Sequence, residues 1–180
     1  MSQPTVGISF NHSLEQLTRE LGATLSQVDK ARTRAVRKLK RWIETQLTRE
    51  LASSVHVRQK AIKHRFRSHV YREGRTVFAH IWIGVNPLDA HTIGKPKQTR
   101  RMKGTRVYQH FFDKAFFVNV YGDEEKVWRR KGKGRFPVIK VQVPIEEEMR
   151  ELLPKYEGPA ARKLAEIFEH ELKFELGWFD

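Results

Sequence analysis

The sequence contains no cysteine, which excludes disulfide bridges, thiolate metal ligands and cysteine nucleophiles. It also lacks a run of about 18 consecutive apolar residues, the length that a membrane-spanning helix needs, so no membrane partner is expected. Residues 1–7 do not show the basic-then-apolar order of a secretory signal, and we therefore expect the protein to stay in the cytoplasm where it is made. With 11 glycines and 7 prolines, there is no low-complexity or collagen-like pattern either.

The eight histidines are not spaced for metal or phosphodiester chemistry. Those in the basic segment 56–69 have no carboxylate close in sequence, and the acidic residues near His91 and His110 are only Asp89 and Asp113. Phosphodiester cleavage normally uses acidic metal ligands or a histidine beside an acid. We therefore expect no catalytic residue, no metal site and no cofactor, and we interpret the histidines as surface or structural residues.

Positive charge is abundant and unevenly distributed. The chain has 35 Lys and Arg against 21 Asp and Glu, a net charge of +14. Residues 145–180 carry a net −5 and the other 144 residues a net +19. Either the basic body faces a polyanion such as nucleic acid, or the acidic end of one copy docks on the basic face of its neighbour. A solvated surface that tolerates high charge is the third interpretation.

Hydrophobic spacing predicts helices at both ends of the chain. A short helix over 9–22 is expected to stop at Gly22, and a long helix is expected from a cap at Ser26 to Ser53. The long helix carries a stripe at steps of three and four, which favours a core-facing surface over the alternative of a dimerising coiled coil: Val28, Ala31, Ala35, Leu39, Trp42, Ile43, Leu47 and Leu51. A basic helix over 57–67 and a final helix over 159–176 complete this set.

Between the helices the apolar period changes to two, which predicts strands. Residues 75–84 have apolar groups on both faces, so we expect this strand to be covered on both sides, by a helix and by a neighbour or subunit. A hairpin is expected from 114–121 and 126–130, and a further strand over 136–143.

This order predicts an α+β fold with N-terminal helices (one long), an antiparallel β-sheet with a hairpin, and a C-terminal helix. We expect one domain over 1–180. It has a helical part at 1–53, a sheet-rich core at 54–145 and an acidic helical part at 146–180.

Two loops concentrate the cations. The polar stretch 86–106 has no clear periodicity, and loops of roughly twenty residues are usually functional or disordered. The candidates for contact with DNA or a partner are Lys97, Arg100, Arg101, Lys103, Arg106, Arg129, Arg130, Lys131, Lys133 and Arg135. Cations without interleaved aromatic residues favour sequence-independent contact with a phosphate backbone. A flexible, solvated loop is the alternative.

Aromatic residues crowd the predicted hairpin. Strand alternation buries only half of them in the domain's own core, and large exposed apolar groups often mark a subunit interface. The candidates for this interface are Phe111, Phe112, Phe117, Tyr121 and Trp128.

Two motifs in a fixed order carry a family resemblance. The strand end Trp82-Ile83-Gly84-Val85-Asn86-Pro87 comes first, and the segment from Arg129 to Ile145, with glycines, cations and Pro137 and Pro144, comes second. Gln98-Thr99-Arg100-Arg101 lies between them. From about Val36 to about Leu153 the chain resembles the minor tail protein Z family, the tail-completion proteins of lambda-like phages and prophages. The loop 129–135 departs from that pattern in being cationic and poor in aromatic residues, so its chemistry is not carried over.

The resemblance implies a structural, non-enzymatic protein of the virion, assembled in the host cytoplasm. It would act at the head-proximal end of the phage tail, in tail completion, head–tail joining and DNA delivery. By analogy with other neck components we expect a ring, with six as the expected copy number. The implied neighbours are the tail terminator, the tape measure protein and double-stranded DNA in the channel. The alternative, supported by charge alone, is a free-standing, sequence-independent nucleic-acid-binding protein.

Overall fold

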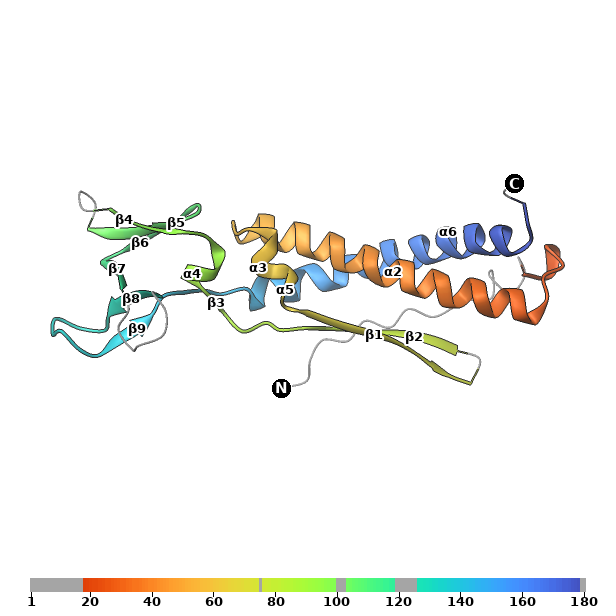
Figure 1. The fold of residues 1–180 in the computed structure, drawn as a ribbon, viewed down its shortest axis with the longest axis horizontal. Coiled ribbons are helices and arrows are strands. Elements are labelled where there is room, and N and C mark those ends of the chain that lie inside the picture. The colour runs from red at the N-terminus through yellow and green to blue at the C-terminus, as the bar shows by residue number, and fades with distance from the viewer. Residues whose placement is uncertain (1–17, 75, 100–102, 119–125, 179–180) are drawn as a thin grey trace. The chain divides into compact units, whose positions relative to one another are not determined.

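The computed structural model describes residues 18–74, 76–99, 103–118 and 126–178 (Figure 1). The chain divides into two compact units, each built from separate stretches of sequence. The first unit comprises Met1–Leu47, Phe66–Ile83 and Arg150–Asp180, and the second comprises Thr48–Arg65 and Gly84–Met149. The predicted α+β fold is confirmed, with a long N-terminal helix, antiparallel hairpins and a C-terminal helix. The expectation of a single domain stays a prediction.

Helix α2 (Leu25–Ser54) confirms the long helix, but its cap differs from the prediction. The hydroxyl oxygen of Thr24 accepts a hydrogen bond from the Gln27 backbone N–H at 3.3 Å, and Gln27 Oε1 accepts one from the Thr24 N–H at 2.9 Å. This is a capping box, in which the first residue and the third helical residue satisfy each other's free donors. The predicted cap at Ser26 is therefore wrong. Of the helix predicted over 9–22, the described end is helical, and the predicted stop at Gly22 has φ +62°.

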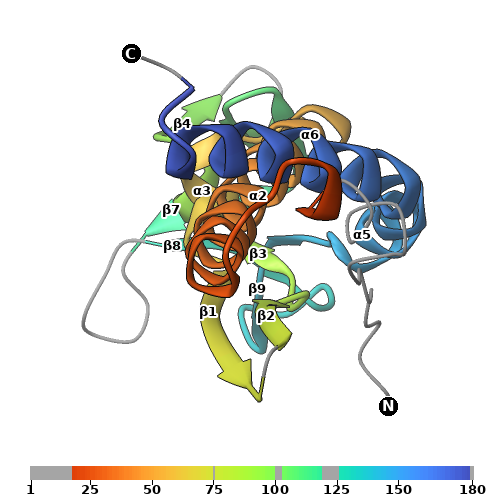
Figure 2. The same ribbon diagram turned by 90° about the vertical axis from the view of Figure 1, so that its right-hand side faces the viewer.

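The core of the first unit lies on both sides of the N-terminal part of α2. Helix α6 (Glu157–Glu175) packs on one side, and the hairpin of β1 (Phe66–Glu73) and β2 (Thr76–Ile83) lies on the other (Figures 1 and 2). Small residues on α2 allow close approach of large ones on α6, since Ala31 and Ala35 share one cluster with the fully buried Phe168. The cluster comprises Val28, Ala31, Ala35, Val36, Leu39, Val77, Ala160, Leu164, Phe168 and Leu172.

Strand β1 was not predicted. The helix expected over 57–67 is confined to α3 (Gln59–Lys63), and the chain then becomes extended from Phe66. Polar residues occupy both faces of β1, which hides its alternation from the sequence pattern. The strand over 75–84 is confirmed as β2, and the expected coverage of its second face by a neighbour or subunit stays a prediction. Only Val77 is buried, because one face packs on α2 and the other is open.

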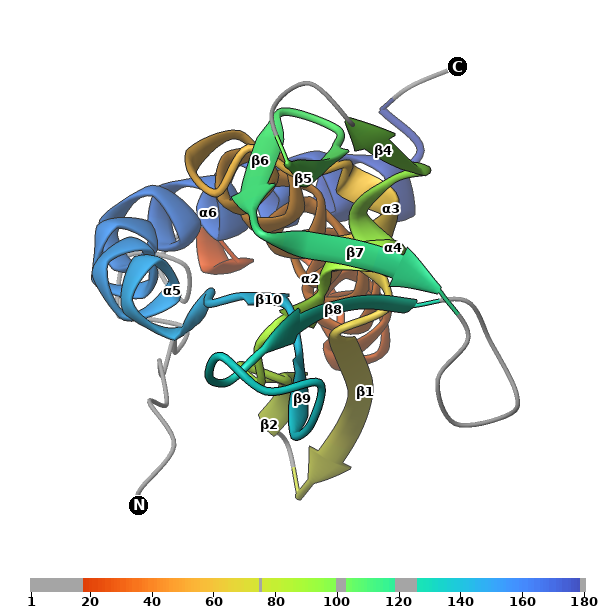
Figure 3. The ribbon, with the colours of Figure 1, turned by 90° about the vertical axis from the view of Figure 1, so that its left-hand side faces the viewer.

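The second unit contains short antiparallel strands (Figure 3). One sheet has the order β4 (Pro96–Thr99), β5 (Gly104–Val107) and β6 (His110–Asp113). Another has the order β7 (Ala115–Val118), β8 (Lys126–Arg130) and β9 (Val138–Lys140), which confirms the predicted hairpin. This unit also contains β3 (Leu88–Asp89), which pairs with β10 (Gln142–Val143), the helix α4 (Ala90–Ile93), the end of α2, helix α3 and the start of α5 (Glu146–Leu152). A 3₁₀ turn, Leu153–Tyr156, leads into α6.

The stretch 86–106 is more ordered than the predicted polar loop. Its described residues form β3, α4, β4 and the start of β5, with Leu88, Ala90 and Ile93 almost fully buried. Strands of two to four residues are too short to show a clear period, so the sequence pattern missed them. The strand predicted over 136–143 is likewise divided, because Val141 separates β9 from β10, which pair with different strands.

Candidate functional site

The first cationic group lies on one face of the β4–β5–β6 sheet. Lys97 on β4 is directly opposite Arg106 on β5, which in turn is opposite Phe111 on β6. Both cations are exposed, and among the described residues neither has an ion-pair partner. Like charges directly opposite each other on a sheet are destabilising, so an anion placed over this row would relieve the repulsion. Lys103 is also exposed, and the predicted Arg100 and Arg101 lie outside the described residues.

A hydrogen-bond network centred on Gln98, on the opposite face of the sheet, connects β4 to the neighbouring strands. Gln98 Nε2 donates to the carbonyl oxygens of Gly104 and Ala115, both at 3.2 Å, and its Oε1 accepts from the Phe117 N–H at 3.2 Å. The hydroxyl of Thr105, a fully buried residue, lies 3.0 Å from that same Oε1. Gln98 therefore connects β4, β5 and β7. Because successive side chains on a strand point to opposite faces, the Gln98 network leaves Lys97 on the other face of β4, where it is exposed.

The second cationic group does not form a single patch. Arg129 is opposite Ala115 and Ile139, whereas Arg130 is opposite Val138. The two arginines therefore project from opposite faces of β8. Lys131, Lys133 and Arg135 follow in an exposed loop, and the guanidinium of Arg135 lies 5.9 Å from the centre of the exposed Phe136 ring.

The predicted aromatic contacts fall into two classes. Phe111, Phe112 and Phe117 are half-buried, and the Phe111 ring covers Gly104, where a Cβ atom would lie 2.6 Å from its Cζ. Trp128 is only 5% exposed, and its indole N–H donates to the Val118 carbonyl oxygen at 3.2 Å. Trp128 is thus a core residue of this unit, which leaves the predicted contact surface to the three phenylalanines. Tyr121 lies outside the described residues.

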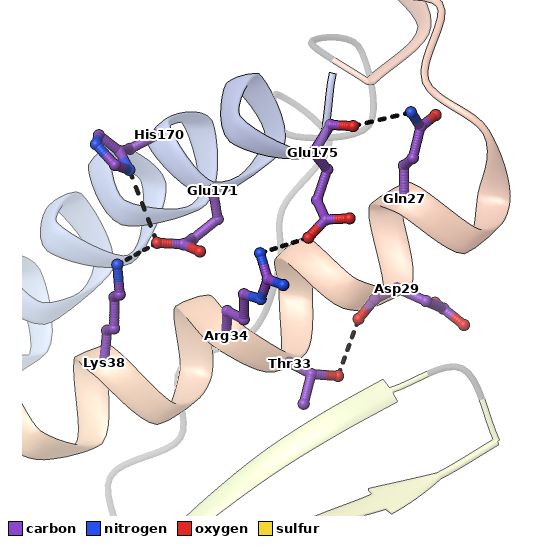
Figure 4. Close-up of polar contacts among 8 residues, drawn as sticks. All are labelled: Gln27, Asp29, Thr33, Arg34, Lys38, His170, Glu171 and Glu175. Atoms are coloured by element: carbon purple, nitrogen blue, oxygen red, sulfur yellow. Dashed lines mark hydrogen bonds and ion pairs between the residues drawn. The ribbon is translucent and has the colours of Figure 1, made fainter. Parts of the chain in front are cut away.

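The acidic C-terminal helix is bound by α2 within its own unit (Figure 4). Glu171, which is 3% exposed, forms an ion pair with Lys38, and Glu175 forms one with Arg34. Gln27 Nε2 also donates to the Glu175 carbonyl oxygen at 3.0 Å. Two of the acidic groups that were expected to seek a neighbouring copy are therefore already paired. The sequence carried a signal for this arrangement, since Lys38 lies next to the apolar stripe of α2.

The open face of the β1–β2 hairpin is a surface that the sequence analysis missed. Across the ladder, three successive pairs consist of planar side chains: Arg67 with Trp82, His69 with His80, and Tyr71 with Phe78. The short connection at Gly74 could have identified segment 66–73 as the hairpin partner of the predicted strand, which places these planar groups opposite one another.

Among the residues that the structure describes, no group of three or more His, Cys, Asp or Glu side chains is placed to bind a metal ion. None of the helices in the described part of the chain combines the length and apolar character that a bilayer crossing demands.

Comparison with known families gives one match over nearly the whole chain. The model of a family described as prophage minor tail protein Z (GPZ) matches residues 12–179. Comparisons with curated proteins and with solved structures gave no match.

Proposed function

Because the chain belongs to the prophage minor tail protein Z family, we propose that it completes the head-proximal end of a phage tail and is needed for head–tail joining or DNA delivery. Membership makes it a structural protein of the phage tail, located in the virion and in contact with other tail components. The observation that carries the proposal is the extent of the match. Residues 12–179 include both compact units, so the proposal applies to the whole described chain and not to one module.

A ring around the axial channel is the proposed form of assembly, with six copies as the expected number. Phe111, Phe112 and Phe117 support it, because half-buried aromatic side chains on neighbouring short strands can gain further burial against a second copy. The tail terminator and the tape measure protein are the proposed neighbours of the ring.

Double-stranded DNA in the channel is the proposed ligand of the Lys97–Arg106 row. The two cations face each other, and neither has a carboxylate partner in the part of the chain that the structure describes, so phosphates would replace this repulsion with attraction. Lys131, Lys133 and Arg135 are exposed in the loop after β8 and are proposed to contact either DNA or the adjoining ring.

The test is cryo-electron microscopy of the neck of the particle that encodes this chain, compared with particles from a deletion of its gene. We expect a ring of density between tail tube and head connector, and tails of the deletion mutant that fail to join heads productively. Finished particles without the protein, or normal infectivity of the deletion mutant, would refute the tail-completion role.

The second candidate is a free-standing protein that binds nucleic acid without sequence preference, and the Lys97–Arg106 row also favours it. A matched pair of variants separates the two functions. Lys97→Glu with Arg106→Glu should abolish duplex binding by the purified chain, and Lys60→Glu with Lys63→Glu, which changes two exposed lysines of α3, should reduce it much less. Micromolar or tighter binding by the monomer, combined with normal tails in the deletion mutant, would favour this candidate.

A further inference from the structure

The β1–β2 hairpin presents two different faces. Its inner face is fixed to α2: Lys40 Nζ donates to Ser68 Oγ at 2.9 Å, and Arg72 forms an ion pair with Asp29 at 3.1 Å. Val70 and Val77 add apolar packing to the core on the same side. These contacts fix which face looks outward, so the outer side chains are exposed by the fold and not by a loose hairpin.

The outer face is an uninterrupted ladder of planar groups. The Arg67 guanidinium lies 6.0 Å from the Trp82 ring centre, the His69 and His80 rings are 5.2 Å apart, and Tyr71 stacks on Phe78 at 5.2 Å with an 18° angle between the planes. Tyr71, Phe78 and Trp82 keep 40%, 37% and 37% of their surface exposed. Successive side chains on one face of a strand are about 7 Å apart, so the six groups form one continuous surface.

The chemistry of this face suits nucleobases. Arg, His, Tyr, Phe and Trp are the side chains on which unpaired bases stack, and these six positions contain no other type. The face carries the positive charge of Arg67, and the only acidic side chain on it is Glu73 at the hairpin tip. A polyanion with planar rings matches this surface better than an apolar protein surface, which would leave Arg67 without an opposite charge.

Cations for a phosphate backbone lie beside the hairpin in the same unit. A groove of about 510 Å³ between α2 and β1 is lined by Ser26, Asp29, Lys30, Thr33, Arg34, Arg37 and Arg72. Asp29 is paired with Arg72, and Arg34 with Glu175. Lys30 and Arg37 are exposed, lie two helical turns apart, and have no ion-pair partner in the described ranges.

We propose that the outer face of the β1–β2 hairpin binds the unpaired bases of a single-stranded nucleic acid, while Lys30 and Arg37 contact its phosphates. Duplex DNA does not fit this role, because its bases are stacked on one another and their faces are not available. The site differs from the Lys97–Arg106 row in unit, in ligand and in mechanism. It does not depend on ring formation or on the proposed role in tail completion.

Fluorescence anisotropy of a labelled oligothymidylate, titrated with the full chain, tests the proposal. Phe78→Ala and Trp82→Ala should each weaken binding about tenfold or more, because stacking one base on an aromatic ring contributes ~1.4 kcal/mol or more. The control is Trp178→Ala, which removes an exposed aromatic side chain of the same unit, just after α6, and should leave binding unchanged. Circular dichroism and melting confirm that each variant is folded, and the two hairpin variants are independent of each other.

Salt dependence separates stacking from phosphate contact. Lys30→Ala with Arg37→Ala should reduce the slope of log affinity against log salt by roughly 1.4, since each contact to a single strand contributes about 0.7. Phe78→Ala should weaken binding at every salt concentration and leave the slope unchanged. A duplex of equal length that binds as tightly as the single strand would overturn the proposal. So would hairpin variants that alter self-association in sedimentation velocity but not binding, because the face would then be a protein interface.

Discussion

Replacing Lys38 with methionine is expected to lower the free energy of unfolding by about 2–3 kcal/mol. The side chains of the Lys38–Glu171 pair are 54% and 4% exposed, so the lysine is half in water and the carboxylate is buried. Methionine keeps most of the apolar stem and removes only the charge that compensates Glu171. Another basic side chain close to this carboxylate is that of His170, whose Nδ1 lies 3.7 Å from Glu171 Oε1. The loss should therefore exceed the roughly 0.2–1 kcal/mol typical of an exposed pair.

The reverse substitution should be much milder. Glu171→Leu removes the buried charge, and Lys38 can extend into water, so we expect a loss below about 1 kcal/mol. The double variant Lys38→Met with Glu171→Leu should have nearly the same free energy of unfolding as Glu171→Leu alone. This corresponds to a coupling energy between the two side chains of about 2 kcal/mol.

Urea unfolding followed by circular dichroism measures these values, with Lys173→Met as the matched control because its partner Glu169 is itself half-exposed. If Lys38→Met and Glu171→Leu lowered the free energy of unfolding by equally small amounts, α2 would not neutralise the acidic helix. The carboxylates of α6 would then again be available to a neighbouring copy.

Three further substitutions test the fold and the basic face. Phe168→Ala should cost about 3–5 kcal/mol in urea unfolding, because the ring is fully buried against α2, and a smaller loss would mean that the cluster collapses around it. Gly104→Ala should destabilise by about 1–3 kcal/mol, since the new Cβ would lie 2.5 Å from a backbone oxygen, whereas Gly132→Ala, with open space around it, should change thermal stability little. Lys97→Glu should raise the free energy of unfolding by about 0.2–1 kcal/mol, because the new glutamate can pair with Arg106. The same substitution should weaken DNA binding, and tighter binding would contradict the proposed role of this row.

The membership in a tail-protein family and the long elements were accessible from the sequence. The stripe from Val28 to Leu51 recurs along most of the 30-residue helix, so its period predicts α2 whatever packs on it. The final helix and the 115–130 hairpin could be predicted for the same reason. The apolar spacing of the helix and the turn of the hairpin each lie within one short segment of sequence. The two family motifs are also read directly from the order of residues.

The surfaces, in contrast, depended on which segments meet. Nothing near Glu171 in sequence shows that Lys38, 133 residues away, neutralises it. Trp128 was expected at an interface because alternation gives two faces, but Val127 and Trp128 project to opposite faces of β8 and are 1% and 5% exposed, so tertiary packing covers both faces there. Arg129 and Arg130 are adjacent in sequence but face opposite ways once β8 forms.

The sequence by itself determined the α+β class, the long and final helices, the excess of positive charge and the family. Tertiary structure alone decided which charges remain unpaired and which aromatic residues remain exposed. The physical reason is that periodicity is a local property of the chain, whereas burial and charge pairing are set by contacts between distant segments. The planar face of the β1–β2 hairpin is the clearest case, because it exists only when Arg67, His69 and Tyr71 lie opposite Trp82, His80 and Phe78.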